Sequence, residues 1–187
     1  MILFLPLIVF GLILIWVIMK YNSLITLKNQ VANAWKQIDV QLKRRHDLIP
    51  NLVNTVKGYM EFEQDTLRQV IEARSAAVNA KGIAESAAKE GELTQALSKL
   101  FGLVENYPNL KANENVSQLM EELTSTENKI SFARQFYNDI ATNFNISQQT
   151  FPGNTIATMF NFQQAQLFQV DRPEEREAPT VNLSMKK

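Results

Sequence analysis

Residues Ile2 to Met19 form a run of eighteen residues that contains no charged and no strongly polar side chain. As an α-helix, this run is roughly 27 Å long at about 1.5 Å per residue, close to the ~30 Å thickness of the hydrocarbon core of a bilayer. Lys20 and Tyr21 follow it directly. A lysine can extend its ammonium group toward the headgroups, and a tyrosine ring is stable at that depth, so we expect these two residues at the membrane interface. The sequence therefore predicts a transmembrane anchor over residues 1–20.

A cleaved signal peptide is the alternative interpretation of the same run. A signal peptide carries lysine or arginine before its apolar part and small residues at a cleavage site behind it. Here no charged side chain precedes the run, and Trp16-Val17-Ile18-Met19-Lys20 ends it. These features favour an uncleaved anchor.

The charges that flank the run predict its orientation. Lys20, Lys28 and Lys36 all precede the first acidic residue, Asp39. Lysines next to a membrane span remain preferentially on the cytoplasmic side. We therefore expect a single-pass protein with its N-terminus outside and its C-terminal domain in the cytoplasm. The reversed topology remains the alternative.

Behind the anchor, apolar residues recur at steps of three and four, which is the spacing of one helix face. They are Leu24, Leu27, Val31, Ala34 and Ile38, followed by Leu42, Ile49, Leu52 and Val56. No helix-breaking residue lies between Met19 and Leu24, so we expect the anchor to continue directly into the first helix of the body. Pro50 interrupts this helix, at a cost of about 3 kcal/mol in a helix interior. Either the helix kinks there, or Asp47 caps a new helix; the undisturbed apolar pattern favours the kink.

Two further helices are predicted from the middle of the chain. The second helix begins near Phe62, and Gly82 and Gly91 are its expected weak points. Its apolar face is mostly alanine: Val70, Ala73, Ala77, Ala80 and Ala84. The third helix carries Leu93, Ala96, Leu97, Leu100 and Val104 and ends at Tyr107-Pro108.

The fourth helix has the clearest pattern, with apolar residues spaced every seven positions, as in the seam of a coiled coil. They are Val116, Leu123, Ile130, Tyr137, Phe144 and Phe151. Asn113 is a candidate N-cap, and Phe151-Pro152-Gly153-Asn154 is expected to stop the helix. A short helix over residues 155–160 follows.

No sustained alternation of apolar and polar residues predicts a strand, so the fold class is all-α. Long amphipathic helices with short connections predict an elongated, antiparallel (up-and-down) four-helix bundle over residues 21–168. Residues 169–187 are polar, with two prolines and a charge cluster, and are expected to be a disordered tail.

Several motifs resemble the LemA family, in order and at the family's spacing. They are Tyr21-Asn22-Ser23-Leu24, Ala34-Trp35-Lys36-Gln37-Ile38-Asp39, Asp47-Leu48-Ile49-Pro50-Asn51-Leu52-Val53, Tyr107-Pro108-Asn109-Leu110-Lys111-Ala112-Asn113, Thr126-Glu127-Asn128-Lys129-Ile130 and Phe151-Pro152-Gly153-Asn154-Thr155. The chain departs from the family at Asn161, where glycine is more usual. If this position needs a positive φ, asparagine tolerates it with little strain.

The resemblance implies a membrane helix, a cytoplasmic helical bundle and a location in the bacterial cytoplasmic membrane. It implies no activity, because LemA-like proteins lack an established biochemical function, although relatives occur among proteins that build magnetosome membranes.

Charged residues beside the apolar faces predict a structural polar layer inside the bundle. Glu127 and Arg134 lie seven residues apart on one face of the fourth helix, and Glu72 and Arg74 could meet them from the second helix. Arg45 belongs to the basic cluster Lys43-Arg44-Arg45, which is expected to be exposed and paired with acids on neighbouring helices. Paired carboxylates can perform acid–base catalysis, but in bundles such pairs more often fix the register of the helices.

The remaining composition excludes several classes of site. The chain has no cysteine and one histidine, His46, so no metal-binding or triad pattern is present; a solvated or capping histidine is expected. Nineteen basic residues balance nineteen acidic ones, which argues against nucleic-acid binding. We expect no cofactor and no metal.

Two functional hypotheses follow. The first is a membrane-anchored interaction or scaffold protein, not an enzyme, with residues 173–176 as a candidate docking segment. Its expected partners are the lipid bilayer and unknown proteins, and a homo-oligomer is a further candidate. The alternative is a membrane-tethered enzyme with a carboxylate-based site around Glu72 and Glu127.

Overall fold

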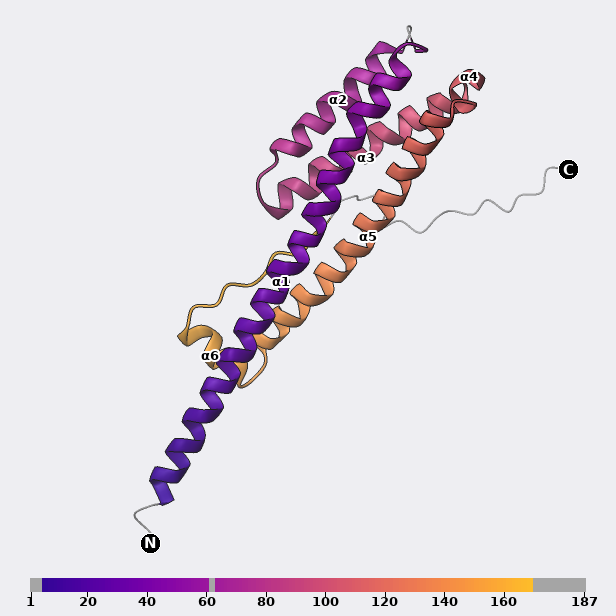
Figure 1. The fold of residues 1–187 in the computed structure, drawn as a ribbon. Helices are drawn as coiled ribbons and strands as arrows, with labels where there is room; N and C mark the ends of the chain where they lie inside the picture. Colours follow the sequence, from indigo (N-terminus) through magenta and orange to yellow (C-terminus); the bar gives the residue numbers. More distant parts are fainter. Residues whose placement is uncertain (1–4, 61–62, 170–187) are drawn as a thin grey trace, which may run out of the picture.

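The computed structural model describes residues 5–60 and 63–169, and within these ranges the chain is helical and contains no strand (Figure 1). The all-α fold class is therefore confirmed. The helices are α1 (Leu5–Lys57), α2 (Gln64–Asn79), α3 (Gly82–Glu105), α4 (Pro108–Lys111), α5 (Glu114–Gln149) and α6 (Gly153–Met159).

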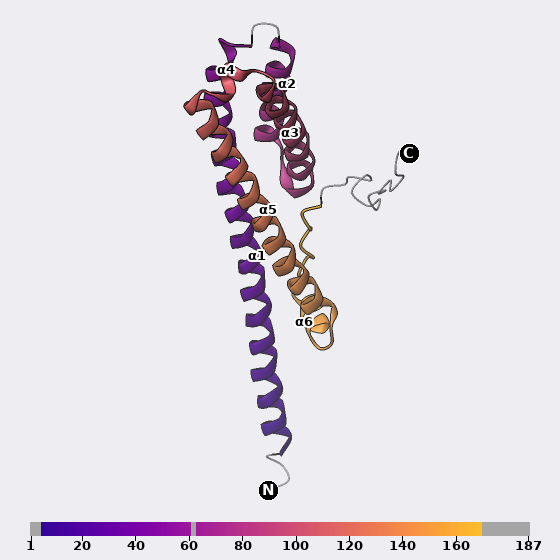
Figure 2. The ribbon, with the colours of Figure 1, turned by 90° about the vertical axis from the view of Figure 1, so that its right-hand side faces the viewer.

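Helix α1 is one continuous rod of 53 residues, roughly 80 Å long. The apolar anchor and the first helix of the body are thus a single element, as predicted. Pro50 lies inside α1, so the helix does not end there and Asp47 does not cap a new one. The exposed part of α1 projects beyond the rest of the molecule toward the N-terminus (Figures 1 and 2).

Helix α5 packs against α1 along most of the body and runs in the opposite direction (Figure 1). Its first five seven-residue positions, Val116, Leu123, Ile130, Tyr137 and Phe144, are all buried, as the spacing predicts. Asn113 is the N-cap, as expected, and accepts hydrogen bonds from the backbone N–H groups of Asn115 (3.0 Å) and Val116 (3.3 Å). Phe151 was expected to continue this face, which is wrong: α5 ends at Gln149, and Phe151 is 84% exposed.

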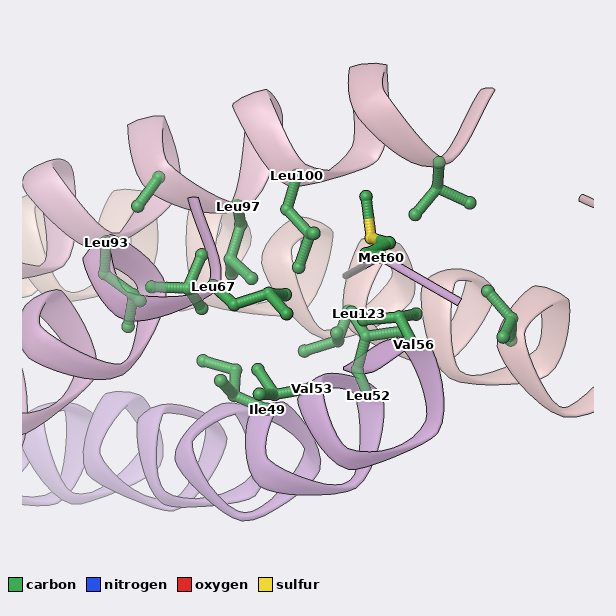
Figure 3. Close-up of a cluster of buried hydrophobic side chains, with 14 of the residues drawn as sticks. Ile49, Leu52, Val53, Val56, Met60, Leu67, Leu93, Leu97, Leu100 and Leu123 are labelled. Atoms are coloured by element: carbon green, nitrogen blue, oxygen red, sulfur yellow. The ribbon is translucent and has the colours of Figure 1, made fainter. Parts of the chain in front are cut away.

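Helices α2 and α3 form a hairpin that covers the end of the α1–α5 pair remote from the N-terminus (Figure 2). Figure 3 shows the core there, where leucines of α2 and α3 face Ile49, Leu52 and Val56 of α1. The chain turns before Gly82, whose φ of 78° requires a residue without a Cβ. Gly91, by contrast, lies buried within α3 and does not interrupt it, and Ala84 is exposed on α3 rather than on the apolar face of the second helix.

The four long helices come together only at this remote end. Nearer the anchor, α1 and α5 are accompanied by α6 and by the extended segment that follows it (Figures 1 and 2). A four-helix bundle over the whole of residues 21–168 is therefore not confirmed.

Helix α6 and an extended strap (residues 162–169) complete the described chain. Between them lies Asn161 with φ 53°, in the left-handed region that asparagine tolerates with little strain. The strap returns along the α1–α5 pair, where the ring of Phe168 packs on Trp35 at 6.0 Å between centroids. The polar tail predicted over residues 169–187 lies outside the described residues apart from Gln169.

Candidate functional site

A cluster of buried charges joins α1, α3 and α5. The Arg45 side chain, 1% exposed, donates to the carboxylate of Glu127 at 2.7 Å and lies 3.4 Å from that of Glu90. Its second terminal nitrogen donates to the hydroxyl of Thr94 at 2.8 Å. Arg45 projects inward because it follows Leu42 and Ile38 on the buried face of α1. We call Arg45, His46, Glu90, Thr94 and Glu127 the charge cluster.

His46 extends the charge cluster toward α2. Its Nε2 atom lies 2.6 Å from the second carboxylate oxygen of Glu90, and its side chain is 13% exposed. Arg74 of α2 donates from Nε to the backbone carbonyl of His46 at 2.7 Å. The solvated or capping histidine expected from the sequence is therefore wrong, because burial on the side of α1 that faces α3 brings His46 against an acid.

The five residues of the predicted polar layer do not all meet. Arg45 and Glu127 are bonded directly, and Arg74 reaches the charge cluster through the backbone of His46. Glu72 lies on the outer side of α2, where it is exposed and pairs with Arg68 at 3.5 Å. Arg134 stands further along α5, with its guanidinium 4.6 Å from the centre of the Phe168 ring. A separation of seven residues places Arg134 about 10 Å from Glu127 along the helix.

Glu90 and Thr94 are members of the charge cluster that the sequence analysis missed. Glu90 is 1% exposed and lies on the same face of α3 as Leu93 and Leu97. A glutamate three and seven residues before buried leucines is the signal that could have identified it, because an acid on an apolar face requires a partner. Glu90 has two such partners, Arg45 and its neighbour in sequence, His46.

The basic cluster Lys43-Arg44-Arg45 is divided by the helix geometry. Arg44 is about half exposed and pairs with Glu122 of α5 at 3.6 Å, whereas Arg45 turns inward. Both arginines thus pair with acids on neighbouring helices, as predicted. Of the two, only Arg44 is exposed.

A pocket of about 230 Å³ adjoins the charge cluster and is bordered by Glu127 and Arg45. Glu127 is 35% exposed and is the one carboxylate of the cluster open to this pocket. Arg45 neutralises it at 2.7 Å, and the second acid, Glu90, is fully buried against Arg45 and His46. This arrangement fixes three helices relative to one another and offers a substrate little free carboxylate.

A second candidate site is an open groove between α1 and α5, with a volume of about 570 Å³. Its floor and walls carry Val40, Phe132 and Phe136, which are 63%, 70% and 48% exposed. Lys36 and Lys129 border it. We call it the α1–α5 groove. Exposed phenylalanines gathered on one face are typical of a surface that binds another macromolecule.

The N-terminal part of α1 is the third feature. By length and composition, α1 is the helix within the described residues that could cross a membrane. The apolar side chains of α1 between Leu7 and Met19 are mostly exposed, so this part of the helix does not belong to the core. Lys20 is exposed, and the ring of Tyr21 packs on Phe160 at 4.7 Å and on Phe162 at 5.9 Å between centroids.

The chain is similar to several known proteins. A family model described as the LemA family matches residues 34–183. Protein LemA of Metamycoplasma hominis is 29% identical over 168 residues, which cover 88% of this chain and 75% of that protein. Magnetosome protein MamQ 2 of Paramagnetospirillum magneticum is 25% identical over 178 residues, and magnetosome protein MamQ of Magnetospirillum gryphiswaldense is 22% identical over 177. In both magnetosome proteins the match covers 81% of this chain and 65% of the relative, slightly less than two thirds of its length.

The apolar helix and these relatives are consistent with a single-pass membrane protein. Because the family model matches most of the residues, the chain belongs to the LemA family.

Proposed function

We propose that this chain is a membrane-anchored scaffold that holds a partner protein at a fixed distance from the bilayer. The observation that carries the proposal is the α1–α5 groove. It exposes two phenylalanines of α5 and a valine of α1, and α1 is continuous with the anchor. The charge cluster supports the role, because it locks α1, α3 and α5 together and so makes the rod rigid.

The groove favours a partner with an amphipathic, acidic helix. Its apolar floor suits leucine or phenylalanine side chains, and Lys36 and Lys129 at its border suit carboxylates. In the orientation that Lys20, Lys28 and Lys36 support, the groove faces the cytoplasm.

Site-specific cross-linking tests this function. A photoactivatable amino acid at Phe132, in the groove, is compared in native membranes with one at Ser98, which is exposed on α3. We expect a defined adduct from position 132 that is lost when Val40→Glu places a charge in the groove, and no such adduct from position 98. Equal labelling from both positions, or an adduct that survives Val40→Glu, contradicts the proposal.

The alternative function is a membrane-tethered enzyme, and the pocket beside Glu127 is the observation that favours it. Glu127→Gln separates the two hypotheses. In a scaffold this change weakens the link to Arg45 and lowers the free energy of unfolding while groove binding is retained. In an enzyme a folded Glu127→Gln protein retains its partners and its cellular role is lost.

A further inference from the structure

At the end of the body that lies nearest the anchor, the segments that pack on α1 carry no charged residue. Residues 140–170 contain no Asp, Glu, Lys, Arg or His, although 20% of the chain is charged. This stretch comprises the end of α5, the turn to α6, α6 itself and the strap. A water-exposed helical end normally carries charged side chains, so their absence over this length requires a physical reason.

Within this uncharged stretch, α6 lies at the height of the membrane boundary on α1. Ile156 and Ala157 of α6 are buried together with Leu24 of α1, and Val17 and Tyr21 pack against the same cluster. Val17 belongs to the apolar run of the anchor, and the Tyr21 ring, just past its end, contacts Phe160 at 4.7 Å. Figures 1 and 2 show that α1 alone, among the described elements, extends beyond the turn between α5 and α6 toward the N-terminus.

Large apolar side chains at this end are exposed. Phe151 is 84%, Met159 73% and Phe160 48% exposed. Phe151 precedes α6, Met159 is its last residue and Phe160 follows it, whereas Ile156 and Ala157 of the same helix are buried. We call residues 150–162 the α6 corner.

We propose that the α6 corner is a second membrane contact, which inserts Phe151, Met159 and Phe160 into the headgroup region of the bilayer that α1 crosses. This inference rests on the membrane anchoring in the proposed function. If the hydrocarbon core ends near Lys20, the packing of α6 on Val17 and Tyr21 fixes the corner at headgroup depth. Aromatic and methionine side chains are favourable there, and the absence of charge avoids the cost of bringing charged groups close to hydrocarbon.

The consequence is a fixed angle between rod and membrane. A single helix can tilt freely about its exit point, whereas two contacts on the same bilayer surface restrain the tilt. The α1–α5 groove would then be held at a defined height and direction above the lipid.

Depth measurements on the full-length protein test this inference. The chain has no cysteine, so a single cysteine can carry a nitroxide label at each chosen position. The protein is placed in nanodiscs of phosphatidylcholine with phosphatidylglycerol, and collisions of the label with apolar oxygen and with a water-soluble nickel chelate are compared.

The test positions are Phe151→Cys and Met159→Cys. Leu12→Cys reports the anchor. Phe132→Cys is the matched control, because it is an equally exposed apolar position on α5 but roughly 25 Å further from the α6 corner along the helix.

We expect the ratio of oxygen to nickel collisions to be highest at position 12, intermediate at 151 and 159, and lowest at 132. A deep label at 12 with labels at 151 and 159 as accessible to nickel as that at 132 overturns the α6 proposal and leaves the anchor intact. Labels at 151 and 159 shielded from both reagents indicate a second protein copy over the corner and also overturn it. A nickel-accessible label at position 12 contradicts the anchor, and with it the proposed function.

Discussion

Asn145 binds both backbone polar groups of Ala165. Its side-chain nitrogen donates to the carbonyl of Ala165 at 2.9 Å, and its side-chain oxygen accepts from the N–H of Ala165 at 2.8 Å. One carboxamide therefore acts as a neighbouring strand would, satisfying the backbone of an extended segment against a helix.

Asn138 repeats this arrangement one step further along the strap. It bonds the carbonyl of Phe168 at 3.0 Å and its N–H at 2.8 Å. Seven helical residues separate the two asparagines, a rise of about 10 Å, and three extended residues span about the same length. The match of these two lengths sets the register of the strap on α5.

The first prediction concerns these paired hydrogen bonds. Asn138→Ala removes two bonds and leaves the N–H and carbonyl of Phe168 without their partner, so the free energy of unfolding should fall by about 1–3 kcal/mol. Amide hydrogen exchange in residues 163–169 should accelerate far more than in α2. Asn143→Ala is the control, because Asn143 is exposed on the same helix. Equal effects of the two substitutions would contradict the role assigned to Asn138.

The second prediction compares two adjacent arginines. Arg45→Met leaves Glu90 buried without its arginine, which should cost about 3–5 kcal/mol. Arg44→Met removes an exposed pair with Glu122 and should cost less than about 1 kcal/mol. Urea unfolding of both variants in the same detergent or nanodisc measures the difference. Similar midpoints for the two variants would show that the charge cluster does not stabilise the fold.

The third prediction concerns Gly153, the first residue of α6. A Cβ atom added at this position would overlap the backbone carbonyl of Ser147, so Gly153→Ala should displace α6 and destabilise the protein by about 1–3 kcal/mol. Gly102 lies within α3 with no atom near its missing Cβ, so Gly102→Ala should instead stabilise by up to about 1 kcal/mol. Thermal unfolding distinguishes the opposite signs, and a stabilised Gly153→Ala protein would contradict the close contact.

Much of this architecture was predictable because helix periodicity is a local property of the sequence. The spacing of Leu24, Ile38 and Leu42 predicts the buried face of α1, and the seven-residue spacing predicts that of α5. At Asn161, where the family usually has glycine, the sequence predicts only that a positive φ would be tolerated, and the structure has φ 53° there.

The strap and the charge cluster depend on contacts between distant segments, which periodicity does not encode. The strap has no regular secondary structure, and its bonds come from side chains of α5. Glu90 meets Arg45 only because the α2–α3 hairpin folds back on α1. The sequence predicts Arg45 and Glu127 as polar-layer residues, but the inward direction of Glu90 and the outward direction of Glu72 follow from how the helices rotate on packing.

The fourth prediction concerns pH. Burial raises the pKa of Tyr137, whose hydroxyl donates to the carbonyl of Gln166 at 2.7 Å. The folded state therefore retains this proton more tightly than the unfolded state, so its contribution to stability is complete below the unfolded pKa of about 10 and is lost as the pH rises above it. Unfolding measured from pH 8 to 11 should show a steeper alkaline loss of stability in the native protein than in Tyr137→Phe. Parallel curves would contradict the prediction.

The fifth prediction concerns the topology of the chain in the membrane, which we expect the lysines after the apolar run to determine. Because Lys20, Lys28 and Lys36 follow the span with no acid before Asp39, the body should lie in the cytoplasm. A single cysteine at Ser98, which is exposed, should therefore be protected from a membrane-impermeant thiol reagent in intact cells and react after the cells are opened. Changing the three lysines to glutamine removes the bias and should expose position 98 in part of the population.

The matched control changes Lys89, Lys99 and Lys111, far from the span, and should leave the cysteine protected. Labelling of position 98 in intact cells that carry the native lysines would instead establish the reversed topology and place the α1–α5 groove outside the cytoplasm.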